Sequence, residues 1–109
     1  MSDVRIDRMT LYVAEAICRT DQSLLSLPLM LAQTWPDAPA LELVVAMSLA
    51  ADGVENVLGQ DGESGVRAQH VWKSAAILGA EIHHLAVLGR PEARARDLLD
   101  YWRGEDVSG

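Results

Sequence analysis

Cysteine is almost absent from this chain of 109 residues, in which Cys18 is the only one. A single thiol excludes a disulfide within the chain and any zinc site built from several cysteines. It also fits a reducing compartment, so we expect a cytoplasmic protein. No histidine lies near Cys18 in the sequence, and we expect this residue to be a small, buried apolar side chain.

Long hydrophobic runs are also absent. The longest strongly apolar stretch, residues 24–32, is interrupted by Ser26 and Pro28 and is far shorter than the roughly 20 residues of a membrane-spanning helix. Residues 1–7 are polar and of mixed charge, which differs from the basic and then apolar order of a secretory signal. We therefore expect no membrane partner.

Basic residues are few, since nine Lys and Arg oppose sixteen Asp and Glu and give a formal net charge of −7 at pH 7. A chain of this charge repels phosphate backbones, so nucleic acid is not an expected partner. The sequence also lacks a nucleotide-binding glycine loop, a dinucleotide fingerprint and the pattern of a serine triad. Enzymes of those classes are not expected.

No segment shows the alternation of polar and apolar residues that is typical of a half-buried strand. Apolar residues recur instead at helical spacing, in segments separated by proline and glycine. The expected helices cover residues 7–20, 22–34, 40–58, 66–88 and 92–103, and Pro28 should bend the second or restart it. Because the connections are short, we predict a single all-α domain over residues 1–109, an up-and-down antiparallel four-helix bundle with a short additional helix and a frayed tail at 104–109.

The expected helix over residues 40–58 carries two apolar stripes. The first consists of Leu41, Val44, Val45 and Leu49, and the second of Leu43, Met47, Ala51, Val54 and Leu58. A helix of this kind should touch neighbours on two sides, and its apolar surface exceeds what one short bundle needs. One interpretation of the chain is therefore a non-enzymatic helical interaction protein, a homodimer or a subunit of a larger assembly.

His70 begins the stretch that points to chemistry, His70-Val71-Trp72-Lys73-Ser74-Ala75-Ala76, which Gly79-Ala80 follows. In a helix, one face collects the apolar side chains Val71, Ala75, Leu78, Ile82 and Leu85. The opposite face collects His70, Lys73, Ser74, Glu81 and His84. We therefore expect His70 to face solvent, with a cation one turn further on and small side chains beside it.

These residues resemble the signature of histidine-containing phosphotransfer (HPt) domains, in which lysine, small residues and then glycine follow the reactive histidine. Asp61-Gly62-Glu63 is similar to the acidic turn before that histidine's helix, and residues 20–25 are similar to a polar turn with paired leucines. Ser74 stands where the family has glycine, and Gly79 comes one residue early. The resemblance implies a small acidic bundle that relays phosphoryl groups to or from receiver domains of response regulators in two-component signalling.

The resemblance gives each matching residue a role. His70 would be the phosphoryl acceptor and Lys73 its electrostatic support, while Ser74, Ile77 and Glu81 would contact the partner. A carrier of this kind has no kinase activity of its own and needs no cofactor, because the partner supplies the metal ion and the activated phosphate. The alternative interpretation of the same residues is a surface histidine followed by an ordinary solvated lysine.

Glu81 and His84 also have the i, i+3 spacing of the metal ligands in ferritin-like bundles. Such sites need a second Glu-x-x-His pair, and the sequence has none. We therefore expect no bound metal.

Overall fold

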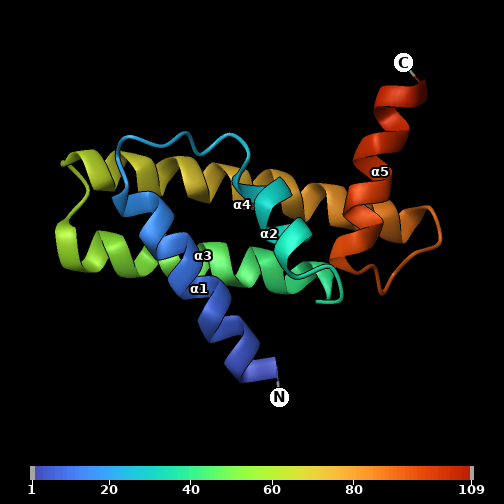
Figure 1. Ribbon diagram of the computed structural model, residues 1–109, viewed down its shortest axis with the longest axis horizontal. Helices are drawn as coiled ribbons and strands as arrows, with labels where there is room; N and C mark the ends of the chain where they lie inside the picture. Colours follow the sequence, from blue (N-terminus) through green and yellow to red (C-terminus); the bar gives the residue numbers. More distant parts are fainter. Residues whose placement is uncertain (1, 109) are drawn as a thin grey trace.

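The computed structural model describes the backbone of residues 2–108 and the side chains of residues 4–104 (Figure 1). Its five helices are α1 (Ser2–Cys18), α2 (Leu27–Thr34), α3 (Ala40–Leu58), α4 (Glu63–Val87) and α5 (Ala95–Ser108). The predicted all-α class is confirmed. Within the described range, β structure is limited to one isolated bridge between Pro39 and Arg94.

An antiparallel hairpin of α3 and α4 forms the centre of the fold. The core between them contains Leu43, Met47 and Ala51 from α3 and Val71, Ala75 and Leu78 from α4. α1 packs mainly on α3. Its inward side chains, Met9, Val13 and Ile17, are fully buried. Figure 1 shows α1 and α5 crossing the hairpin obliquely, so α3 and α4 are the pair that matches the antiparallel neighbours predicted for a bundle.

The two apolar stripes of α3 are covered unequally. Leu43, Met47 and Ala51 are covered by α1 and α4, whereas Leu41 is 60% exposed and Leu49 is 52% exposed. α3 thus contacts neighbours on two sides, α1 and α4, as predicted. An uncovered apolar stripe remains on its outer side.

The turn between α3 and α4 depends on two glycines. Gly59 follows the last residue of α3 and has a φ of +82°, a backbone conformation that residues other than glycine rarely adopt. Gly65, in the first turn of α4, lies against the backbone of the turn, because an added Cβ would be 2.5 Å from the carbonyl oxygen of Gly59. This contact allows α4 to begin at Glu63, three residues before the predicted start.

The other end of the hairpin is closed by α2, α5 and their connections. Pro28 lies in the first turn of α2. Of the two outcomes predicted for it, a bend or a new helix start, the structure has the helix start. The amide of Ala95 donates to Ala38 at 2.8 Å and the amide of Ala40 donates to Ala93 at 2.9 Å. These bonds join the starts of α3 and α5. α5 continues to Ser108, beyond the predicted end at residue 103 and through most of the predicted frayed tail, of which Gly109 lies outside the described residues.

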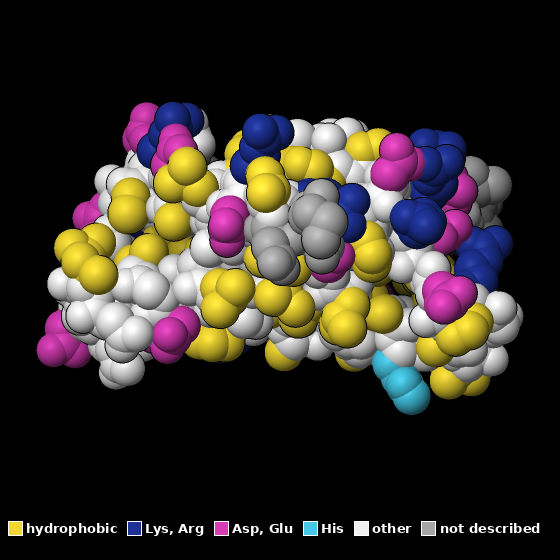
Figure 2. All heavy atoms as spheres, turned by 90° about the horizontal axis from the view of Figure 1, so that it is seen from below, with side chains coloured by type: hydrophobic (Ala, Val, Ile, Leu, Met, Phe, Trp, Pro, Cys, Tyr) yellow, Lys and Arg dark blue, Asp and Glu magenta, His cyan; other side chains and the backbone are white. Residues whose placement is uncertain are grey.

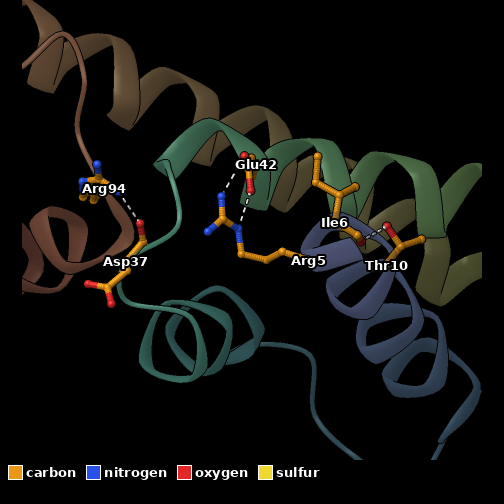
Figure 3. A network of polar contacts seen from close by, with 6 residues as sticks. All are labelled: Arg5, Ile6, Thr10, Asp37, Glu42 and Arg94. Carbon is orange, nitrogen blue, oxygen red and sulfur yellow. Dashed lines mark hydrogen bonds and ion pairs between the residues drawn. The ribbon is translucent and has the colours of Figure 1, made fainter. Parts of the chain in front are cut away.

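Polar contacts tie the N-terminal helix and the C-terminal connection to α3 and its preceding turn (Figure 3). Arg5 of α1 donates to both carboxylate oxygens of Glu42, at 2.8 and 3.2 Å. The hydrogen bond with Glu42, supported by the Coulombic attraction, raises the pKa of Arg5 above its ordinary value. Near the start of α5, Arg94 donates to the carbonyl oxygen of Asp37 at 2.6 Å. No helix in the described part of the chain has the length and apolar character that crossing a membrane requires.

Candidate functional site

The outer face of α4 carries the residues of the HPt-like motif. His70, Lys73 and Ile77 are exposed, and Ser74 is half-buried between them. Val71, Ala75 and Leu78 point the other way and are buried against α3. The division of α4 into a polar and an apolar face is therefore confirmed, and His70 and Lys73 lie one turn apart on the exposed side.

A hollow of about 590 Å³ lies beside His70, between α4 and the segment of residues 19–26. His70, Lys73, Ser74 and Ile77 contribute to the α4 wall. Leu24 and Leu25 contribute to the opposite wall. The imidazole is thus at the edge of an open, partly apolar depression.

A second hollow, of about 650 Å³, continues along α4 towards α2 and α5. It is lined by Leu29, Glu81 and Trp102, among others, and it shares Leu25, Ser74 and Ile77 with the first hollow. Because three lining residues are common to both, the hollows form one continuous surface feature. We call it the α4 groove; it extends from Glu63 to Glu81 along one side of α4.

Arg67 fixes the segment that forms the far wall of the groove. Its guanidinium donates to the carbonyl oxygens of Ala16 at 2.8 Å, Ile17 at 2.7 Å and Arg19 at 2.8 Å. These carbonyls lie at and just beyond the C-terminus of α1, where the regular pairing of the helix ends. Two of them also accept a backbone amide, Ala16 from Arg19 and Arg19 from Gln22. The positive charge also interacts favourably with the negative end of the helix dipole. Arg67 therefore holds the start of segment 19–26 against α4, one turn before His70.

Glu81 lies apart from the histidine. It follows His70 by eleven residues, which is about 16 Å along a helix axis. One carboxylate oxygen accepts a hydrogen bond from the indole nitrogen of Trp102, at 3.0 Å. Of the predicted site residues, His70, Lys73, Ser74 and Ile77 therefore share one hollow, and Glu81 belongs to the adjoining one together with Ser74 and Ile77.

The residues that sequence reasoning missed are those of the opposite wall. Leu25 is 95% exposed and lines both hollows, and Leu29 and Trp102 line the second. Leu24 and Leu25 were expected inside a helix over residues 22–34, but α2 begins only at Leu27, so both leucines lie in the connection before it. Their position beside α4 depends on the bonds of Arg67 to α1, which span about 50 residues and have no local signature.

The other candidate residues do not form a second site. No group of three or more potential metal ligands occurs among the residues that the structure describes. His84 is exposed, and its ring lies 5.9 Å from that of Tyr101. Cys18 is exposed at the end of α1, so the prediction that it is buried is wrong. Its neighbour Ile17, which takes the inward position of that turn, is buried.

Comparison with known proteins found no relative of this chain, since no protein-family model, curated protein or solved structure matches it at a significant level.

Proposed function

We propose that the chain is a histidine phosphotransfer protein that relays phosphoryl groups to or from receiver domains. The observation that carries this proposal is the exposure of His70 on α4, with Lys73 and the half-buried Ser74 one turn away. A receiver's acyl phosphate can approach such a ring without displacing another element of the fold. The α3–α4 hairpin would then be the antiparallel half of the four-helix bundle that the HPt resemblance implies.

The proposed chemistry is a transfer between two proteins. The unprotonated ring nitrogen of His70 attacks phosphorus, and a nitrogen–phosphorus bond forms as the bond between phosphorus and the receiver's acyl oxygen breaks. The aspartate carboxylate leaves with the electron pair of that bond, and the second ring nitrogen of His70 keeps its proton until water accepts it. Lys73 places a positive charge one turn away, where it attracts the phosphoryl oxygens. A metal ion held by the receiver supplies the remaining charge compensation, and both proteins would meet in the cytoplasm.

Labelling with a small phosphoryl donor tests this role without a partner. Phosphoramidate should phosphorylate the wild-type chain at one acid-labile, base-stable site, and His70→Ala should remove that label. His84→Gln is the matched control, because His84 is exposed on the same helix outside both hollows. Label that persists in His70→Ala, or that divides equally between His70 and His84, would contradict a dedicated acceptor.

A second candidate function is assembly through α3, and one observation favours it. The outer stripe of α3 exposes Leu41 and Leu49, and no charged residue occurs between Glu42 and Asp52. Figure 2 shows hydrophobic side chains gathered along the side of the molecule on which α1 and α3 lie. A second copy of the chain packed on this stripe would remove it from water.

Sedimentation separates this candidate from the first. If α3 mediates a homodimer, the wild type should sediment as a dimer and Leu49→Glu as a monomer. If the wild type remains a monomer at concentrations up to about 100 μM, where even weak specific dimers are populated, homodimerisation through α3 is excluded. The phosphoramidate label on His70 does not depend on either result.

A further inference from the structure

The α4 groove is long, open and largely apolar. It extends over residues 63–81 of α4, about 27 Å at 1.5 Å per residue. Its walls expose several large apolar side chains, among them Leu25 at 95%, Ile77 at 63% and Leu29 at 40%. Ser74 is half-buried and lies where the two hollows join. Because its side chain is small, it does not fill the groove at that point. An apolar depression of this length between helices matches a helical ligand of about 18 residues.

The charge in the middle of the groove has the opposite sign to that of the whole chain. Lys73 makes no ion pair within the described part of the structure. Arg67 is engaged by backbone carbonyls and forms no ion pair with a carboxylate among the side chains described. The carboxylates lie at the two ends, where Glu63 begins the groove and Glu81 is bonded to Trp102. A chain of net charge −7 thus presents a positive centre along an apolar depression.

We propose that the α4 groove binds an amphipathic helix of another protein, with apolar side chains towards Leu25 and Ile77 and an acidic residue towards Lys73. Apolar residues at i, i+3 or i+4, and i+7 of the ligand would fill the two hollows. An aspartate or glutamate near the middle would compensate Lys73, and a basic residue there would be repelled. The proposal concerns docking and does not rest on phosphoryl transfer to His70.

A displayed peptide library tests this directly. The probe is a phage library of 18-residue amphipathic helices with a fixed apolar stripe and with variable central positions that are acidic in half the clones and basic in the other half. The chain should enrich the acidic half. The best clone, made as a fluorescently labelled peptide, should bind with an affinity that anisotropy can measure. This assay uses no phosphoryl donor, and phosphoramidate labelling uses no peptide, so the two proposals fail separately.

Surface variants identify the binding site. Ile77→Glu and Leu25→Glu should each weaken the selected peptide at least about tenfold, because each places a carboxylate in the apolar contact. Leu11→Glu is the matched control, since it introduces the same charge at an exposed leucine on α1, outside both hollows, and should leave the affinity unchanged. Lys73→Glu should shift the preference towards basic peptides. Circular dichroism confirms that each variant is folded.

Four results would overturn the proposal: enrichment of basic peptides, no peptide that binds more tightly than about 100 μM, equal binding to the wild type and to Ile77→Glu, or a wild-type dimer that Ile77→Glu dissociates. The last result would assign the groove to a second copy of the chain.

Discussion

Replacement of Arg67 by methionine tests how the far wall of the α4 groove is held. Methionine keeps a long, apolar side chain on α4 but removes the three hydrogen bonds to the carbonyls of Ala16, Ile17 and Arg19. A hydrogen bond to a charged group contributes about 1.5–3 kcal/mol. These three share one guanidinium at a partly exposed site, where water can replace some of them, so the free energy of unfolding should fall by about 2 kcal/mol in total rather than by the sum.

The assay is urea and thermal unfolding followed by circular dichroism. A loss of about 2 kcal/mol in a domain of this size should lower Tm by roughly 10 °C. Arg67→Lys should give an intermediate loss, because an ammonium keeps the charge but cannot span three carbonyls as the planar guanidinium does. Arg8→Met is the control, since Arg8 is exposed on α1 and makes no hydrogen bond or ion pair among the residues described. If Arg67→Met costs no more than Arg8→Met, the capping argument is wrong. Faster amide exchange in residues 19–26 of Arg67→Met should accompany the loss.

Three further outcomes follow from the packing of the helices. Gly65→Ala should destabilise the fold by about 1–3 kcal/mol in urea unfolding, because its Cβ would overlap the backbone of Gly59 and Gln60, and a neutral result would contradict that contact. Gly79→Ala should raise stability by up to about 1 kcal/mol in the same assay, since the position is helical and open, and a loss would mean that the site is crowded. The raised pKa of Arg5 implies a stabilisation that, while Glu42 is ionised, is fully present below the pKa of arginine in the unfolded chain. It is lost as pH rises through the higher pKa of the folded state. The difference in unfolding free energy between the wild type and Arg5→Met should therefore have no slope between about pH 6 and pH 10, and a slope there would refute the assignment.

The sequence predicted the helices well because their signals are local. Apolar spacing placed five residues on the inward face of α4, and four of them are buried while Ile82 is half-buried; the five are Val71, Ala75, Leu78, Ile82 and Leu85. The same spacing correctly placed His70 and Lys73 on the exposed side. Pro28 was expected either to bend the helix over residues 22–34 or to restart it, and the structure has a helix start there, since α2 begins at Leu27. The expected helix was wrong for residues 22–26, which are not helical.

Relations between distant segments could not be predicted in the same way. The hydrogen bonds of Arg67 to α1 and the exchange of bonds between Ala38–Ala40 and Ala93–Ala95 join residues about 50 positions apart. Neither set of hydrogen bonds corresponds to a periodic pattern in the sequence. The exposed leucines of α3, Leu41 and Leu49, show a related limit, because helical spacing identifies an apolar face but does not say whether a neighbour covers it. The wall of the groove formed by residues 19–26 was missed for the same cause.

Phosphoryl transfer between the chain and a receiver domain is the decisive test of the phosphorelay role. The chain is labelled with phosphoramidate, freed of the donor, and mixed in turn with each receiver domain encoded in the genome of its source, and the phosphoryl group is followed by mass spectrometry of both intact proteins. If the chain is a histidine phosphotransfer protein, at least one receiver should remove the label from His70 within minutes, and His70→Ala should have no label to lose. A His70 label that no receiver accepts, or a chain that acquires none, would contradict a phosphorelay role.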